Sequence, residues 1–225
     1  MTLVQTVHEI EYPESDGMPM GETDLHRDWM VRILDILRLR YRGQRVYVAS
    51  DLLLYYQEGD PTKFVVPDDF VVLDCDPARR NTFKIWEEDN RVPHAVFEVT
   101  SRSTRREDEV FKPRVYARIG VPEYFLYDPT SDYLSPPLQG FRIDRGNYTR
   151  ITPDDTGALR CEQLGITLRL ERGNLAMVDA RSGQVLRTEA EAAEAARQAA
   201  EARVAELEAE VRRLQAELRR QSRDP

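Results

Sequence analysis

Apolar residues recur every three to four positions in the segment "ETDLHRDWMVRILDILRLRYRG", residues 22–43. That spacing puts them on one face of a helix, and Gly43 supplies a stop signal. The segments that follow are shorter, are rich in Val, Tyr, Leu and Phe, and are bounded by turn residues, as is typical of strands. These predicted strands are "QRVYVAS", "DLLLYYQEG", residues 70–73 and "RVPHAVFEVTS".

A second helix is predicted within "STRREDEVFKPRVYARIG", residues 103–120. Its apolar stripe is formed by Val110, Arg114 or Val115, and Ile119. Because Pro113 cannot donate a backbone hydrogen bond inside a helix, we expect the helix to begin near Phe111–Lys112, with the proline in its first turn. "VPEYFLYDP" then reads as a final central strand. The predicted order is α-β-β-β-α-β, an α/β (α+β) core with a right-handed crossover between its last two strands.

After Asp128 the chain changes character. Short predicted strands alternate with turns made of Gly, Asn and Asp, and we expect these strands to form β-hairpins that flank the core.

The last 38 residues, 188–225, consist almost entirely of Ala, Glu, Arg, Leu and Gln. Apolar residues step by three and four along the second half of this segment, at Val204, Leu207, Val211, Leu214 and Leu218. Those are the a and d positions of a heptad repeat, so the segment predicts a C-terminal coiled-coil helix that forms a homodimer. The alternatives are a helix that packs back on its own domain and a solvated tail. The expected domains are residues 1–187 and residues 188–225.

The composition narrows the possible functions. The net charge of −8 argues against a protein that coats nucleic acid nonspecifically, although it leaves room for a local basic channel. Two cysteines do not make a disulfide framework. No stretch approaches the length of a membrane span, and the first residues lack the features of a signal peptide. We therefore expect a cytoplasmic protein with no membrane partner.

Two acids and a lysine stand where an open sheet would bring them together. Glu98 follows the apolar run Ala95–Phe97, and Asp68 opens the preceding apolar strand. Carboxylates on adjacent strands repel one another unless a cation relieves them, and Mg²⁺ is commonly held by one or two carboxylates and water. Lys112, one of only three lysines in the chain, follows Asp108 by one helical turn. Taken singly, such residues are more often structural. An Asp before an apolar strand is usually a turn residue, an acid at a strand end is usually solvated, and a lysine in a charged run usually lies on the surface.

Several motifs in the same order resemble the Uma-two family of restriction-endonuclease-like proteins, within the PD-(D/E)XK nuclease superfamily. The resemblance covers roughly residues 10–180. The matching segments are "YPESDG" with His26 following, "PDDF", "FEVTS", "DEVFKPRVY" and "GVPEYFLYDP". The resemblance implies a restriction-endonuclease-like fold with the α-β-β-β-α-β order reached above.

The resemblance also implies roles for particular residues. Asp68 and Glu98 would hold a metal ion, Mg²⁺ or Mn²⁺, and would act in catalysis together with Lys112. The superfamily's Glu-x-Lys triplet would place a lysine at position 100, but this chain has Thr100, so Lys112 is expected to replace it. The choice between Asp68 and Asp69 is open from strand alternation, and the family pattern favours Asp68. Supporting positions around the site are His26, Ser101, Asp108 and Tyr116.

Two functions follow from this reading. The first is a metal-dependent endonuclease that hydrolyses phosphodiester bonds in DNA, with Arg102, Arg105 and Arg106 contacting phosphates. The alternative for these arginines is a solvated loop. The second function is a noncatalytic interaction protein, in which a nuclease-like scaffold carries a dimerising coiled coil.

Overall fold

The structure is a computed structural model that describes residues 10–15 and 23–221, and it separates into two units, residues 1–186 and residues 187–225. Asp16 and Gly17 of the "YPESDG" motif lie outside the described residues. None of the helices in the described ranges has the length and apolar character of a membrane span.

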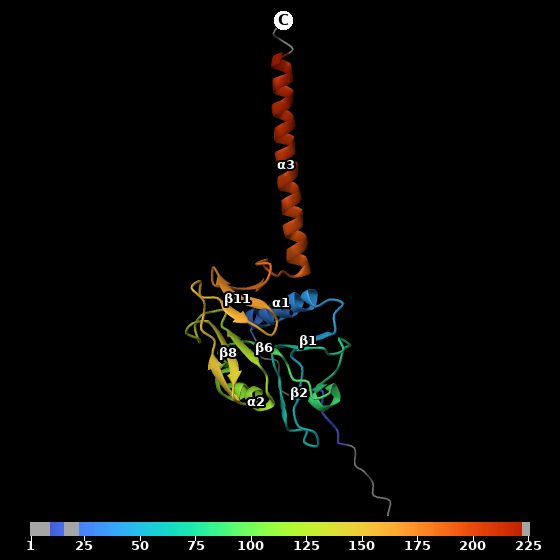
Figure 1. The fold of residues 1–225 in the computed structure, drawn as a ribbon, viewed down its shortest axis with the longest axis vertical. Coiled ribbons are helices and arrows are strands. Elements are labelled where there is room, and N and C mark those ends of the chain that lie inside the picture. Colours follow the sequence, from blue (N-terminus) through green and yellow to red (C-terminus); the bar gives the residue numbers. More distant parts are fainter. Residues whose placement is uncertain (1–9, 16–22, 222–225) are drawn as a thin grey trace, which may run out of the picture. The chain divides into compact units, whose positions relative to one another are not determined.

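A six-stranded sheet forms the centre of the first unit, in the order β1-β4-β6-β7-β8-β9 (Figure 1). Only β6 and β7 in this sheet are parallel, and helix α2 connects them. The strands are β1 (Val46–Ser50), β4 (Asp69–Leu73), β6 (Ala95–Val99), β7 (Glu123–Tyr127), β8 (Leu138–Asp144) and β9 (Asn147–Arg150). With α1 (Asp24–Arg40) and α2 (Lys112–Ile119), the core has the predicted order: α1, β1, β4, β6, α2, β7.

Two small sheets flank this core. One has the order β10-β11-β12, made of β10 (Leu159–Cys161), β11 (Ile166–Glu171) and β12 (Asn174–Asp179). The other has the order β3-β2-β5, made of β2 (Leu54–Tyr55), β3 (Phe64–Val65) and β5 (Phe83–Lys84), and a short 3-10 helix, η1 (Ile85–Glu88), follows it. The predicted flanking hairpins are therefore present as β8–β9 and β11–β12. The segment "DLLLYYQEG" was predicted as a strand, and it contributes only the two-residue β2, which lies outside the main sheet.

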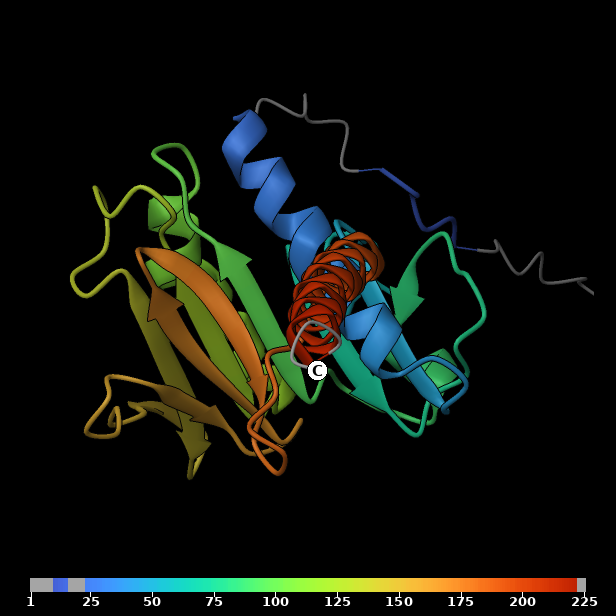
Figure 2. The ribbon, with the colours of Figure 1, turned by 90° about the horizontal axis from the view of Figure 1, so that it is seen from above.

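Strand alternation divides the interior into two apolar layers. Val48, Val71 and Phe97 face one layer, where α1 and the β10-β11-β12 sheet cover them. Helix α1 contacts β1, β4 and β6 on this side (Figure 2). The residues that alternate with these along each strand face the second layer. Val115 and Tyr116 of α2 and Phe83 of the β3-β2-β5 sheet line the other side of that layer. Successive side chains of a strand point to opposite faces, so the position of a carboxylate along a central strand determines which of the two layers it faces.

The chain enters α2 through a π-helical turn, η2 (Glu107–Phe111), in which the Lys112 N–H bonds to the Glu107 carbonyl. The wider turn suits the following Pro113, which has no N–H and would crowd the preceding turn of an α-helix. The buried side chains here are Asp108, Lys112, Val115 and Tyr116, whereas Val110 is 44% exposed. The predicted stripe was thus wrong at Val110, whereas Val115 and Ile119 do pack against the second layer. The paired charges of Asp108 and Lys112 occupy the rest of the buried face.

The second unit contains one long helix, α3 (Glu189–Gln221), which begins where the Thr188 hydroxyl accepts a hydrogen bond from the Glu191 N–H. Glu191 in turn accepts one from the Thr188 N–H, which completes a capping box. The five apolar residues of the predicted seam, Val204, Leu207, Val211, Leu214 and Leu218, are all exposed, between 45% and 65%.

Candidate active site

Asp68 and Glu98 meet because β4 and β6 pair antiparallel, with Asp69 opposite Phe97. The Asp68 N–H donates to Oε2 of Glu98 at 3.2 Å, and the Val99 N–H donates to Oδ2 of Asp68 at 2.7 Å. Both side chains are buried, at 5% and 1% exposure. Each carboxylate is therefore held by backbone of the neighbouring strand and has little freedom to move.

Lys112 reaches the same point from α2. Its Nζ lies 2.7 Å from Oε2 of Glu98, 3.1 Å from Oδ1 of Asp108 and 3.7 Å from Oδ1 of Asp68. We refer to these four residues as the carboxylate–lysine cluster. One ammonium thus lies among three buried carboxylates, and Lys112 itself is only 4% exposed.

Two tyrosines support the cluster from the second apolar layer. The Tyr116 hydroxyl donates to Oε1 of Glu98 at 2.5 Å, so both oxygens of Glu98 are engaged. The Tyr124 hydroxyl donates to the backbone carbonyl of Asp108 and fixes the π-helical turn. Of the expected supporting residues, Asp108 is therefore a member of the cluster and Tyr116 contacts it directly.

His26 approaches from the opposite layer, on the first turn of α1. Its Nε2 lies 2.9 Å from Oδ2 of Asp68, and its ring is buried. Thr23 caps this turn by accepting a hydrogen bond from the His26 N–H, so the start of α1 sets where the imidazole stands. Ser101 lies apart from the carboxylates and hydrogen-bonds Ser103 and Thr104 in the loop after β6.

Burial and mutual repulsion determine the charge of the cluster. Burial raises the pKa of Glu98 well above its usual range, against the attraction of Lys112. Burial likewise raises the pKa of Asp108, to about 6. For Asp68, the Lys112 ammonium and the His26 hydrogen bond outweigh burial and lower the pKa. Burial opposes the charge on Lys112, but the three carboxylates outweigh it and hold the pKa of Lys112 well above its usual range. The cluster thus carries a surplus of acid that favours protons or an added cation.

Asp69 is adjacent to Asp68 in sequence and is also buried, but it faces the other layer and has different contacts. It is fully buried. Because Asp69 lies two residues before Val71 on β4, both side chains point to the same face, toward the layer beneath α1. Within the described part of the chain, neither of its side-chain oxygens has a hydrogen-bond partner. Burial, with a further contribution from Asp68, raises the pKa of Asp69 well above its usual range. Burial thus favours the protonated form of Asp69 over its carboxylate, and Asp68 is the member of this pair that belongs to the cluster.

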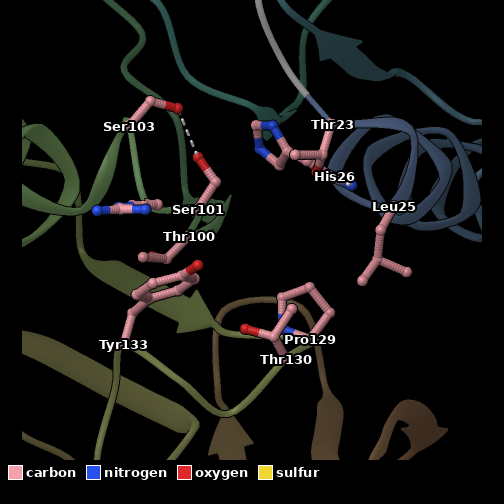
Figure 3. A pocket seen from close by; sticks show the side chains of 10 residues that line it. Thr23, Leu25, His26, Thr100, Ser101, Ser103, Pro129, Thr130 and Tyr133 are labelled. Atoms are coloured by element: carbon pink, nitrogen blue, oxygen red, sulfur yellow. Dashed lines mark hydrogen bonds between the residues drawn. The ribbon is translucent and has the colours of Figure 1, made fainter.

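A cavity of about 430 Å³ opens beside His26, at the carboxyl ends of the parallel strands β6 and β7 (Figure 3). Its lining is rich in hydroxyl groups: Thr23, Thr100, Ser101, Ser103, Thr130 and Tyr133. Thr100, which stands where the superfamily has a lysine, is one of these residues, and its buried hydroxyl has no partner within the described residues. Position 100 therefore lines a cavity, while Lys112 supplies the ammonium at Glu98.

Asp128 shapes this cavity, and sequence reasoning gave it no role. Its two carboxylate oxygens accept hydrogen bonds from the backbone N–H groups of Thr130, Ser131, Tyr133 and Leu134. The loop after β7 is thereby wrapped around one buried side chain. The signal in the sequence was the "DPTSD" run, because Asp followed by Pro and Thr is typical of a turn closed by the Asp side chain.

The three arginines expected at phosphates are all exposed and differ in their contacts. Arg102 lines the cavity, whereas Arg105 forms an ion pair with Glu109 at 2.8 Å. Arg106 lies on the surface at the start of the π-helical turn. The structure thus places one of the three, Arg102, at a concave surface near the site.

Comparison with known proteins gives one family match and one distant structural match. A protein of Anabaena variabilis ATCC 29413, described as a "putative nuclease belonging to DUF820", has a crystal structure that matches with a TM-score of 0.46 and 14% identity, over 79% of this chain and 82% of that one. No curated protein matches the sequence. The family model of Uma2, described as "Putative restriction endonuclease", matches residues 8–171. That match spans well over half of the chain and agrees with the motifs around Asp68, Glu98 and Lys112, so this protein belongs to the Uma2 family.

Proposed function

We propose that this protein is a divalent-metal-dependent endonuclease that hydrolyses phosphodiester bonds in DNA, with Asp68, Glu98 and Lys112 as its catalytic residues. The observation that carries the proposal is the position of the Lys112 ammonium, 2.7 Å from Glu98 and 3.7 Å from Asp68. A buried lysine between two buried carboxylates contributes little to stability compared with apolar packing, so its presence favours a chemical role.

The residues fit a hard divalent cation. Restriction-endonuclease-like proteins generally use divalent metals, and Asp68 and Glu98 offer oxygen ligands on two adjacent strands. Within residues 10–15 and 23–221, no group of three or more His, Cys, Asp or Glu side chains is arranged to hold a metal ion. Mg²⁺ nevertheless needs only one or two carboxylates when water and phosphate complete its shell. The surplus of buried acid in the cluster supports binding of Mg²⁺ or Mn²⁺ by Asp68 and Glu98.

Each residue of the cluster has a distinct task in this proposal. When bound, the ion supplies Lewis-acid polarisation of the phosphate and of water. Lys112 holds a permanent positive charge that orients a water and stabilises the negative charge that develops on the phosphate. His26 and the Val99 N–H fix Asp68, and Tyr116 fixes Glu98, so the two carboxylates stay in place during the reaction.

The direct test is cleavage of plasmid DNA and of labelled oligonucleotides by the full-length protein with Mg²⁺, with Mn²⁺ and with EDTA. We expect cleavage that requires the ion and that is lost in Lys112→Ala. Isothermal titration should show Mn²⁺ binding to the wild type and none to Asp68→Ala. Cleavage that persists in EDTA, or full activity of Lys112→Ala, would contradict the proposed mechanism.

We also propose that the protein is a homodimer through α3. The support is the line of five exposed apolar residues at heptad positions, from Val204 to Leu218, on a helix of 33 residues. Thin amphipathic helices of this kind gain most of their stability from packing against a partner. Two copies would provide two catalytic sites for the two strands of a duplex. The same seam is what favours the second candidate function, a noncatalytic interaction protein, which would lack ion-dependent cleavage.

A further inference from the structure

A second concave surface lies along the open edge of the main sheet. It is a groove of about 620 Å³ whose floor is β1, the outermost strand of the sheet. One wall is the end of α1 and the turn after it, with Arg38, Tyr41 and Arg42, and the other wall is the loop after β4, with Arg79 and Arg80. We refer to this surface as the arginine groove.

The charge of the groove is opposite to that of the chain. Four arginines and no acidic residue line it, although the whole protein has a net charge of −8. Arg38, Arg42 and Arg79 are exposed. Arg80 is held in place, because its guanidinium pairs with Glu88 and lies 4.3 Å over the ring of Tyr47. Positive charge gathered in this way on an acidic protein indicates a site for an anionic ligand.

Backbone donors add to the floor of the groove. The Arg45 carbonyl accepts from the Cys75 N–H, and the Asp51 N–H donates to the Asp68 carbonyl, so the odd-numbered residues of β1 bond toward β4. In an antiparallel pair the intervening residues point the other way, which turns the N–H groups of Val48 and Ser50 toward the open edge.

The groove also leads to the catalytic residues. Ser50 lines its end, and the Ser50 hydroxyl donates to the backbone carbonyl of Asp68 at 2.6 Å. From there β1 extends for five residues, roughly 17 Å at the usual strand rise. In B-form DNA the phosphates of one strand advance about 3.4 Å each along the helix axis and lie farther apart along the backbone itself, so this length can contact a few consecutive phosphates.

We infer that the arginine groove binds the phosphodiester backbone of the nucleic acid on one side of the catalytic site. The inference rests on the proposed nuclease function, since continuity with Asp68 is what favours a nucleic acid over an acidic peptide added to the edge of β1. Arginine suits this role because its planar guanidinium bonds two phosphate oxygens at once.

The test measures binding of a fluorescein-labelled 20-base-pair DNA duplex of mixed sequence by anisotropy, in EDTA and over a series of salt concentrations. The double variant Arg38→Gln, Arg79→Gln removes two exposed arginines of the groove. Log affinity falls with log salt concentration, and each lost phosphate contact reduces the steepness of that fall by about 0.9. The slope of the double variant should therefore be shallower by about 1.8, and its affinity for the duplex should be lower by about tenfold or more. Arg181→Gln, an exposed arginine in the turn after β12, is the matched control and should bind like the wild type.

Cleavage assays on the same preparations separate this inference from the nuclease proposal. A wild type that cleaves DNA, together with a double variant of unchanged slope and affinity, would overturn the groove and leave the nuclease in place. Groove-dependent binding without cleavage would support the groove and contradict the nuclease. If the double variant lost binding to a polyglutamate peptide that the wild type binds, while its DNA binding was unchanged, the inference would be overturned and the groove would bind an acidic peptide instead.

Discussion

The Nζ atom of Lys112 lies 2.7 Å from Oε2 of Glu98, although the two residues belong to different elements, α2 and β6. The lysine comes from a helix, and the position two residues after Glu98, just past the end of β6, is occupied by Thr100. The π-helical turn before Pro113 places Lys112 and Asp108 on the same buried face. A side chain that ordinarily lies at the surface is thereby positioned among three carboxylates.

Removing this ammonium should weaken the fold as well as the chemistry. Lys112→Ala leaves the buried carboxylates without their cation, and breaking a buried pair in this way costs about 3–5 kcal/mol. We expect thermal unfolding of Lys112→Ala in EDTA to occur at clearly lower temperature at pH 7, and the loss to shrink at pH 5, where the carboxylates take up protons. An unfolding midpoint equal to that of the wild type at both pH values would mean that the cluster is not charged as described.

Lys112→Arg should retain the charge and still fail in catalysis. A planar guanidinium cannot occupy the place of a compact ammonium among Glu98, Asp108 and Asp68. We expect cleavage to fall at least about a hundredfold, while circular dichroism shows a folded protein. Activity within a few-fold of the wild type would show that only the positive charge matters.

Asp68→Asn and Asp69→Asn form a matched pair of neighbours. Asp68 belongs to the cluster, whereas Asp69 is buried on the other face of the sheet, where neither of its side-chain oxygens has a hydrogen-bond partner among the described residues. We expect Asp68→Asn to abolish Mn²⁺ binding in isothermal titration, and Asp69→Asn to bind Mn²⁺ with wild-type affinity. Loss of Mn²⁺ binding in a folded Asp69→Asn protein would reverse the assignment of the metal ligand.

Asp108 should make the stability of the ion-free protein depend on pH. Its folded-state pKa is raised to about 6 from 3.8, so the folded protein keeps a proton that the unfolded chain has already lost. The stability gained from that proton is full below pH 3.8 and is lost as the pH rises through 6. Between pH 5 and pH 7 the loss is about 1 kcal/mol.

Asp108→Asn should remove this contribution, and urea unfolding in EDTA at several pH values measures it. The wild type is compared with the variant because other groups titrate in the same range. His94 is one of them, since burial lowers its pKa and thereby opposes the trend. Parallel stability curves for the two proteins would contradict the raised pKa of Asp108.

The seam on α3 should determine the oligomeric state. Leu207→Glu with Leu214→Glu places charges at two d positions, and we expect light scattering to show a monomer in place of a dimer. The control is Ala209→Glu with Ala216→Glu, which adds the same charge at positions facing away from the seam and should leave the dimer intact. Truncation after Arg187 should also give a monomer with a folded core, because residues 1–186 form their own unit. One mass for all of these proteins would exclude α3 as the dimer interface.

The sequence by itself determined the elements, their order and the identity of the family. Helical spacing from Trp29 to Leu37 and the apolar run ending at Glu98 are local patterns, and local patterns reflect the period of one element. The heptad seam of α3 could be named for the same reason, since its spacing within one segment is visible without a fold. Asp68, Glu98 and Lys112 were named from their places at strand ends and in a helix, together with the resemblance to the family's motifs.

Only the tertiary structure decided what those residues touch. Strand alternation alone left Asp68 and Asp69 open, and the layers built by distant segments place Asp68 with Lys112. The buried face of α2 includes the predicted Val115, but the burial of Lys112 depends on its ion pairs with carboxylates, which no apolar pattern contains. The arginine groove is the extreme case, because Arg38 and Arg79 are about forty residues apart in the sequence and meet only at the edge of β1. Contacts between remote segments depend on how faces pack, and no spacing along the chain encodes that.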